Sequence, residues 1–391
     1  MATRPGLLLD ITRSLRRLRH RYPSGIDRVE RAYITWAIGQ EAQFLARQPG
    51  GWYQLDADGA RALVALLDGG SWPLDLSARL RPDRDHGIRM GEAMVRHHAR
   101  RKGRLATLAG AGEVYLNTGH VNLSDDVMAG LGACRRVVML HDLIPLEHPE
   151  FARPNGPRLM RARLRAACRA DHLVAISEDT ARRITRVAAA EGLSPPPITV
   201  IPIGIDPPGS VAPPGDAEPY FVCLGTIEPR KNHALLLDLW QPDWPPLHVI
   251  GRRGWENREV FARLDRAPDN VIEENDLDDA TVWQRIAGAT ALLFPSHVEG
   301  FGLPLAEALA RGTPAIVSDI AAFREVGGDV PEYLPPDDPV AWRSMIRAYI
   351  AGPTARVAQT ARMSFWQQPG WPRHFCALES LLEGFPLNKT G

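Results

Sequence analysis

Cysteine is scarce in this sequence, and no two cysteines lie close together. The four that occur are Cys134, Cys168, Cys223 and Cys376. Disulfide-stabilised small domains and structural zinc sites both need clustered cysteines at short spacings, so we expect neither of them. Isolated thiols are also typical of proteins that work in the reducing environment of the cytoplasm.

Long apolar runs are absent as well. No uninterrupted apolar stretch approaches the ~20 residues that a membrane-spanning helix requires. The N-terminal residues 1–10 become polar too soon for a secretory signal. The sequence therefore predicts a cytoplasmic protein that is free in solution or bound peripherally to the inner face of the cytoplasmic membrane.

Neither sign of charge is in excess, because 46 basic residues balance 46 acidic ones. A balanced chain has no general affinity for nucleic acid, which we do not expect as a partner. The first half nevertheless holds three groups of basic residues, which fit an anionic membrane or a phosphorylated acceptor as well as they fit solvated helix faces. These groups are Arg13, Arg16, Arg17, Arg19, Arg21, Arg28 and Arg31; Arg96, Arg100, Arg101, Lys102 and Arg104; and Arg153, Arg158, Arg161, Arg163, Arg165 and Arg169.

A chain of 391 residues predicts two domains of about 200 residues each. Short apolar runs that alternate with helix-like segments predict α/β domains with parallel sheets. A stretch rich in proline and glycine, residues 207–219, is the predicted linker. We therefore expect a first domain over 1–206, a second over 220–370 and a separate amphipathic helix within 371–391. Residues 71–104 are predicted to be irregular.

The most informative stretch is residues 295–307, which read Pro-Ser-His-Val-Glu-Gly-Phe-Gly-Leu-Pro-Leu-Ala-Glu. It follows an apolar run, 291–294, that predicts a buried strand, and a helix is predicted to begin at Leu303. Glycines in the turn allow a backbone to approach a ligand closely, and the helix N-terminus presents free N–H groups to an anion. Glu299 and Glu307 stand on either side of the turn, so we expect both to face one crevice.

A second anion-binding pattern opens the second domain. The predicted strand 220–224 leads into Gly-Thr-Ile-Glu-Pro-Arg-Lys-Asn, from Gly225 to Asn232. An arginine forms two parallel hydrogen bonds to phosphate oxygens, and a lysine adds a point charge. Arg230 and Lys231 are therefore candidates for binding a diphosphate.

Together these two patterns resemble the signatures of the retaining, GT-B-type glycosyltransferases of family 4. The matching segments are Glu-(seven residues)-Glu at 299–307, with Gly-Phe-Gly-Leu-Pro inside it, and Glu-Pro-Arg-Lys-Asn at 228–232. The resemblance implies a GT-B fold, in which two Rossmann-like, doubly wound α/β domains face a central cleft and the final helix crosses back to the first domain. It also implies transfer of a sugar from a nucleotide diphosphate to an acceptor hydroxyl with retention, without metal or other cofactor.

The same resemblance assigns roles to residues of the second domain. Glu299 orients the donor sugar, Glu307 holds the ribose hydroxyls, and Arg230 with Lys231 binds the diphosphate. The catalytic candidates are His141, Glu299, Arg230 and Lys231. The other donor-binding candidates of this domain, which act through the backbone, are Gly225, Gly300, Phe301, Gly302 and Leu303.

The first domain contributes three candidates. Gly25 lies in a turn between the first predicted strand and a helix, and a phosphate-binding loop and a simple turn both stay open. His141 follows an apolar strand, where open α/β sheets bind ligands, and the resemblance places it at the donor sugar. We expect Asp142 to fix the orientation of its ring. Ser177 is a donor-site candidate and equally a helix N-cap.

The identity of the donor stays open. Gly-Trp at 254–255 and Ile-Glu-Pro-Arg-Lys-Asn at 227–232 are similar to segments of bacterial mannosyltransferases of surface-polysaccharide pathways. This similarity favours GDP-mannose over a UDP-sugar, and a sugar or a lipid-linked sugar as acceptor, in polysaccharide or glycolipid synthesis. Two alternatives remain: a GT-B epimerase or hydrolase of nucleotide sugars, and a non-catalytic sugar-nucleotide-binding partner.

Overall fold

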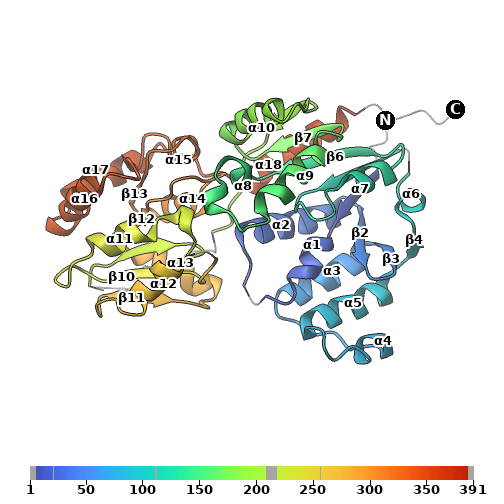
Figure 1. Ribbon diagram of the computed structural model, residues 1–391, viewed down its shortest axis with the longest axis horizontal. Coiled ribbons are helices and arrows are strands. Elements are labelled where there is room, and N and C mark those ends of the chain that lie inside the picture. Colours follow the sequence, from blue (N-terminus) through green and yellow to red (C-terminus); the bar gives the residue numbers. More distant parts are fainter. Residues whose placement is uncertain (1–5, 21, 111, 208–217, 256, 386–391) are drawn as a thin grey trace.

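Two sheets of mostly parallel strands form the framework of the molecule, one in each half of the chain (Figure 1). The computed structural model describes residues 6–385, except 21, 111, 208–217 and 256. This arrangement confirms the predicted fold of two Rossmann-like α/β domains. The predicted linker, residues 207–219, lies almost entirely outside the described residues.

The first sheet has the strand order β4-β3-β2-β1-β5-β6-β7-β8, and the chain winds outward in both directions from β1. All neighbours from β2 to β8 are parallel, whereas β3 and β4 add an antiparallel edge. The strands are β1 (Gly6–Asp10), β2 (Gln43–Gln48), β3 (Gly51–Leu55), β4 (Arg101–Gly103), β5 (Glu113–Asn117), β6 (Arg135–Leu140), β7 (His172–Ala175) and β8 (Ile198–Val200).

Helices cover both faces of this sheet, as parallel strands require. They are α1 (Thr12–Arg17), α2 (Gly25–Gly39), α3 (Ala57–Leu67), α4 (Leu76–Arg79), α5 (His86–His98), α6 (Leu105–Leu108), α7 (Asp125–Gly130), α8 (Ile144–Glu147), α9 (Gly156–Ala167) and α10 (Glu178–Ala190), with a 3-10 turn, η1 (Pro149–Phe151). The prediction of irregular structure over 71–104 is wrong, because α5 runs through it. Met94 and Val95 of α5 are fully buried, but the arginines and histidines around them obscure this apolar face in the sequence.

The second sheet is parallel throughout, in the order β11-β10-β9-β12-β13-β14. Its strands are β9 (Phe221–Leu224), β10 (Leu247–Ile250), β11 (Val271–Glu274), β12 (Ala291–Phe294), β13 (Ala315–Ser318) and β14 (Glu332–Leu334). Its helices are η2 (Pro229–Lys231, a 3-10 turn), α11 (His233–Leu239), α12 (Arg258–Leu264), α13 (Asp279–Gly288), α14 (Leu303–Ala310), α15 (Ala321–Gly327), α16 (Pro339–Ala351) and α17 (Thr354–Met363).

The two segments that connect the domains lie against each other. The backbone N–H of Ile205, which follows the first domain, donates to the carbonyl of Pro369, which follows the second, at 3.1 Å. A Cβ on Gly204 would meet the backbone nitrogen of Trp371 at 2.4 Å, so only glycine allows this approach. Both connections therefore pass through one place.

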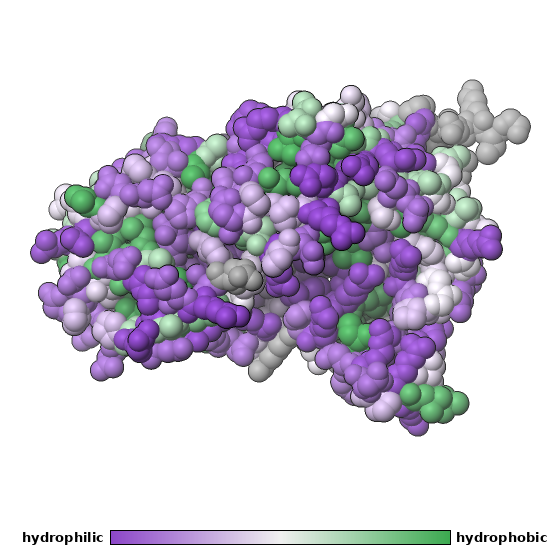
Figure 2. All heavy atoms as spheres, viewed as in Figure 1, coloured by the Kyte–Doolittle hydropathy of each residue, from purple (hydrophilic) through white to green (hydrophobic). Residues whose placement is uncertain are grey.

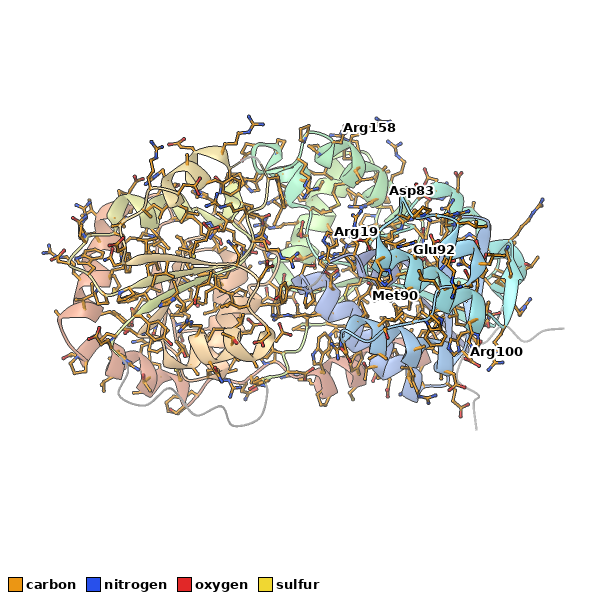
Figure 3. The ribbon with its side chains drawn as sticks, turned by 90° about the horizontal axis from the view of Figure 1, so that it is seen from below. Arg19, Asp83, Met90, Glu92, Arg100 and Arg158 are labelled. Atoms are coloured by element: carbon orange, nitrogen blue, oxygen red, sulfur yellow. The ribbon has the colours of Figure 1, made fainter. Side chains whose placement is uncertain are left out.

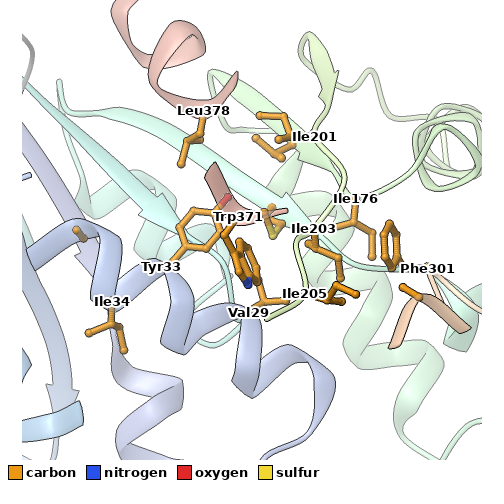
Figure 4. Packing of buried hydrophobic residues seen from close by; sticks show 14 of the residues in the cluster. Val29, Tyr33, Ile34, Ile176, Ile201, Ile203, Ile205, Phe301, Trp371 and Leu378 are labelled. Atoms are coloured by element: carbon orange, nitrogen blue, oxygen red, sulfur yellow. The ribbon is translucent and has the colours of Figure 1, made fainter. Parts of the chain in front are cut away.

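The last helix, α18 (Trp371–Glu383), packs on the first domain rather than on the second. The hydroxyl of Tyr33 in α2 lies 2.6 Å from Nε2 of His374, and the ring of Trp36 stacks on Phe375 with centroids 5.0 Å apart. Val29 and Tyr33 of α2, the connection around Ile205, and Trp371 close this junction with apolar side chains (Figure 4).

Several of the basic residues in the first half form ion pairs. Examples are Arg31 with Asp68, Arg96 with Asp75, Arg100 with Asp56 and Arg161 with Glu191. Seen from below, Arg100 and Arg158 lie at the outer edge of the first domain, whereas Arg19 lies toward the second domain (Figure 3). Part of the positive charge of this half is therefore neutralised locally. In the described part of the chain, no helix combines the length and the apolar character needed to cross a membrane.

Candidate active site

Arg230 and Lys231 lie in η2, just beyond the carboxyl end of β9. Nε of Arg230 is 2.6 Å from Oε1 of Glu228, and its Nη1 is 2.5 Å from Oε2 of Glu299. Nζ of Lys231 is 2.6 Å from the other oxygen of Glu299. Two cations from one loop and two carboxylates thus form a single ion-pair array, which we call the cation array.

Electrostatics keep Glu299 charged inside this array. Burial favours the protonated acid, but Arg230 and Lys231 outweigh it and lower the pKa of Glu299 to about 2. Burial lowers the pKa of Lys231, an effect that Glu299 opposes. Glu228, whose pKa is raised by burial, belongs to the array although the sequence analysis gave it no role of its own. Its position two residues before Arg230 is the sequence feature that could have indicated this ion pair.

Gly225 makes room for the lysine of the array. Its φ is +138°, and a Cβ there would meet Cε and Nζ of Lys231 at 3.2 Å. A side chain at this position would be strained and would press on the lysine. The role of Gly225 is therefore to let Lys231 cross the end of β9 and reach Glu299.

The turn between β12 and α14 packs against the first domain. A Cβ on Gly300 would meet the carbonyl oxygen of His141 at 2.3 Å, and the hydroxyl of Ser177 donates to the carbonyl of Gly300 at 2.9 Å. Gly302, at φ +106°, precedes the first residue of α14, and the side chain of Phe301 is buried in the core. Gly300 therefore allows a close approach to the backbone of the first domain, whereas the sequence predicted a close approach to a ligand.

Ser177 caps α10 while it bridges the domains. Its Oγ accepts from the backbone N–H of Thr180 at 3.0 Å, and the residue is fully buried. Nearby, both carboxylate oxygens of Glu325 in α15 accept backbone N–H groups at the start of α10, from Glu178 and Asp179. The structure thus engages the Ser177 hydroxyl in a cap and an interdomain hydrogen bond.

His141 is held by backbone rather than by its neighbour in sequence. Its Nε2 lies 2.6 Å from the carbonyl oxygen of Thr118, so this nitrogen donates and Nδ1 carries the lone pair. Asp142 instead accepts the N–H of Ile144 at 3.1 Å. Our expectation that Asp142 fixes the imidazole is therefore wrong. Burial lowers the pKa of His141 to about 4, so the ring is neutral at neutral pH.

Glu307 lies in α14 and pairs with the first domain rather than with the cation array. Nη1 of Arg28, from α2 of the first domain, is 2.5 Å from its Oε1. A cavity of about 1290 Å³ opens here, with Glu307, Arg28, Asp279 and Leu303 in its wall. Within the described residues, Glu299 does not line this cavity, because it is turned into the cation array. Lys231, which pairs with Glu299, also acts electrostatically on Glu307, and that both carboxylates face one crevice stays a prediction.

The first domain approaches this cavity through the start of α2. Gly25 is the first residue of that helix, and a Cβ on it would meet Cδ1 of Leu303 at 3.0 Å. The preceding Ser24 and Asp27 form a capping box, with the N–H of Ser24 donating to Asp27 at 2.7 Å. Arg28, which the sequence analysis placed only in a basic group, is brought to the site by this helix start.

Sequence models of known families match both domains of this chain. The model described as Glycosyltransferase Family 4 matches residues 116–208, and that described as Glycosyl transferases group 1 matches residues 211–338. Together these segments cover more than half of the chain. The chain belongs to the GT-B glycosyltransferases of family 4 type.

Curated relatives of this family 4 chain include bacterial mannosyltransferases. The serotype-specific mannosyltransferase WbdA of Escherichia coli is 28% identical over 249 residues, which is 57% of this chain and 30% of that protein. The O-antigen chain mannosyltransferase RfbU of Salmonella typhimurium is 33% identical over 137 residues, 34% of this chain and 38% of that protein. The chain thus spans only about a third of the length of these relatives.

Solved structures share the two-domain fold of this family 4 chain. HepE of Anabaena, in complex with UDP-glucose, has a TM-score of 0.61 at 15% identity, with 96% of this chain and 99% of that one covered. TarM of S. aureus has a TM-score of 0.56 at 12% identity, with 76% of this chain and 59% of that one covered. At these identities the likeness concerns the fold.

Proposed function

We propose that this chain transfers a sugar from a nucleotide diphosphate to an acceptor hydroxyl, with retention of the anomeric configuration, in the synthesis of a bacterial surface polysaccharide or glycolipid. The observation that carries the proposal is the cation array. Arg230 and Lys231 stand preorganised there, near Asp142 of the first domain, and α14 begins four residues after Glu299.

The array suits the charge that develops when the donor bond breaks. The leaving group is a nucleoside diphosphate, so negative charge grows on its phosphate oxygens in the transition state. Fixed cations in a buried site stabilise this charge strongly, because they need no reorganisation. Arg230 donates several N–H groups in a rigid plane and Lys231 adds a point charge. In this proposal the phosphates share both cations with Glu299.

Glu299 and His141 are assigned to the sugar rather than to covalent chemistry. Glu299 stays ionised and accepts hydrogen bonds from sugar hydroxyls, while the ring of His141, with Nε2 committed to Thr118, offers Nδ1 as an acceptor. Neither is proposed as a nucleophile. The acceptor hydroxyl attacks from the face that the leaving group vacates, which retains the configuration, and its proton passes to an oxygen of the departing diphosphate.

Metal independence is part of the proposal. The countercharge for the leaving diphosphate is assigned to Arg230 and Lys231. Transfer should therefore proceed at an unchanged rate in the presence of EDTA, and a rate that is lost with EDTA and restored by Mg²⁺ or Mn²⁺ would contradict this assignment.

GDP-mannose is the leading donor, and a UDP-sugar is the alternative. The mannosyltransferase names of the relatives support the first, and the complex of HepE with UDP-glucose keeps the second open. A thermal-shift screen against GDP, UDP, ADP and dTDP identifies the base, because a ligand that binds the native state raises the unfolding midpoint. We expect GDP to give the largest rise; no rise with any of the four would contradict the proposal.

Product analysis then separates transfer from the two alternative functions. Incubation of the donor with and without a sugar or lipid-linked sugar acceptor is followed by mass spectrometry and by NMR of the anomeric proton. A retained linkage formed only with acceptor supports the proposal. Free sugar or an isomerised nucleotide sugar in both samples indicates a hydrolase or epimerase, and an unchanged donor indicates a non-catalytic partner.

We also propose that the protein works in the cytoplasm at the inner face of the membrane, where it meets lipid-linked acceptors. The projecting end of the first domain exposes Leu76 and Leu80 at 74% and 73%, with Arg79 and Arg81 beside them. Figure 2 shows hydrophobic atoms at this end, where Figure 1 labels α4. Apolar side chains among arginines favour an anionic bilayer surface. Sedimentation with vesicles of anionic but not zwitterionic lipid tests this proposal.

A further inference from the structure

Arg28 belongs to the first domain, but its guanidinium ends among carboxylates of the second. Nη1 lies 2.5 Å from Oε1 of Glu307, and Nη2 lies 3.4 Å from Oδ1 of Asp279. The capping box of Ser24 and Asp27 fixes the backbone just before it. The side chain is therefore aimed across the cleft by the start of a helix rather than by a loose loop.

Glu307 depends on this contact more than on any other described cation. Its side chain is 4% exposed, and the charged groups that face it are Arg28 from α2, Asp279 from α13 and Lys231 from η2. Burial raises the pKa of Glu307, and Asp279 adds to that effect, whereas Arg28 and Lys231 oppose it. Lys231 is held by Glu299, so Arg28 supplies the direct countercharge.

The two oxygens of Glu307 have different environments. Oε1 receives the guanidinium of Arg28, while Oε2 has no hydrogen-bond partner in the described part of the chain. Both Arg28 and Glu307 line the cavity of about 1290 Å³. One oxygen is thus anchored, and the other is left to accept hydrogen bonds from a ligand in that cavity.

We infer that Arg28 is a positioning residue for the nucleotide, holding Oε1 of Glu307 so that Oε2 can accept hydrogen bonds from the vicinal hydroxyls of the ribose. The inference rests on the proposed function. It has a structural consequence: the ribose site is complete only when both domains meet, so nucleotide binding and cleft closure favour each other. Linkage of this kind works in both directions.

The test compares Arg28→Ala, Arg28→Lys and a control, Arg61→Ala, by calorimetric titration with GDP and with UDP. Arg61 pairs with Asp58 on the surface of the first domain and does not line the cavity, so its loss removes an equal charge without touching the site. We expect about a tenfold rise in Kd for Arg28→Ala, since removing one partner leaves the other charge buried and unpaired. Arg28→Lys should recover most of this loss, and Arg61→Ala should change Kd by less than about twofold.

Two further measurements separate positioning from simple structural support. In Arg28→Ala, the loss of nucleotide affinity on acidification should begin at a higher pH than in the native protein, because Glu307 then holds a proton more readily. In the Glu307→Gln background, Arg28→Ala should add little to Kd, because two residues that act through one contact are not additive. Parallel pH profiles, full additivity, or an unchanged Kd in Arg28→Ala would each overturn the inference.

The outcomes also distinguish this inference from the proposed function. If the native protein binds GDP or UDP and Arg28→Ala binds it equally well, only the role of Arg28 fails. If the native protein binds neither nucleotide, both the proposed function and the inference fail. Should Arg28→Ala not fold, Arg28→Gln takes its place in each measurement, because it removes the charge and keeps most of the side chain.

Discussion

Glu299 and Glu307 are buried carboxylates eight positions apart, and they are neutralised in different ways. Glu299 receives both countercharges from its own domain, from Arg230 and Lys231. Glu307 receives its direct countercharge from Arg28, across the cleft. The first arrangement can form in an isolated second domain, whereas the second exists only while the domains touch. We expect the phosphate end of the donor site to be preformed and the ribose end to depend on closure.

The largest effect is expected from breaking the preformed end. Arg230→Ala and Lys231→Ala should each lower the rate of sugar transfer by about 100- to 1000-fold, the range seen when one preorganised electrostatic group is removed. Each should also lower the free energy of unfolding, by about 3 kcal/mol, because Glu299 is left in a buried site with one cation fewer. Transfer kinetics and urea unfolding measure both effects, and the exposed pair of Arg61 with Asp58 supplies a control, Arg61→Ala.

Breaking the closure-dependent end should affect binding rather than chemistry. Glu307→Ala is expected to raise the Kd of the nucleotide about tenfold or more while the rate at saturating donor falls much less. A calorimetric titration set beside saturation kinetics measures the two quantities. A large fall in the rate at saturating donor with unchanged Kd would show that Glu307 acts in the transfer step rather than in nucleotide binding.

The pH dependence should differ between the ends in sign and range. The folded-state pKa of Glu299 is about 2, below its ordinary 4.5, so its contribution to stability is complete above pH 4.5 and is lost only as the pH falls toward 2. The pKa of Glu307 is raised, so it takes up a proton at higher pH than an ordinary glutamate. Lowering the pH from 8 to 5 should therefore weaken nucleotide binding more in the native protein than in Glu307→Gln, where only the terminal phosphate of the nucleotide still titrates.

His141→Ala is expected to have an intermediate effect, confined to transfer. The ring is neutral above a pKa of about 4, so its titration should not shape the transfer rate between about pH 6 and pH 8. The variant should lower the transfer rate about 10- to 100-fold with little change in nucleotide Kd. Equal losses in transfer and in binding of the bare nucleotide would place His141 at the nucleotide instead of at the sugar.

The smallest effect should follow from Ser177→Ala. It removes an N-cap and a hydrogen bond to the carbonyl of Gly300, which is expected to lower the free energy of unfolding by about 1 kcal/mol. Nucleotide Kd should change less than about twofold. A large rise in Kd would show that the Ser177 hydroxyl reaches the donor after all.

The fold and the second-domain motifs were open to prediction because their determinants are local in sequence. Apolar runs followed by glycine turns mark the parallel strands, and the segments at 228–232 and 299–307 each carry their cations or carboxylates within a few residues. The partners across the cleft were not open to prediction in this way. Arg28 and Glu307 are 279 positions apart, and nothing near either of them in the sequence announces the other.

The prediction of how His141 is oriented was wrong for a related reason. His141 and Asp142 follow the end of β6, and the carboxylate of Asp142 accepts from the backbone N–H of Ile144 instead of the neighbouring ring. The partner is a backbone carbonyl at Thr118, which no side-chain pattern reveals. Residues 71–104 were missed because charged side chains outnumber the few apolar ones that make the buried face of α5.

The hydrogen bond between Ile205 and Pro369 has a mechanical consequence. Both connections meet at one point, and α18 is anchored on the first domain. The second domain is therefore attached to the first through a single hinge. A single hinge allows the second domain to rotate rather than to slide. The displacement should therefore be smallest beside Gly204 and should grow with distance from it. Labels placed far from this pivot, one on α16 and one on α5, should report the swing most sensitively.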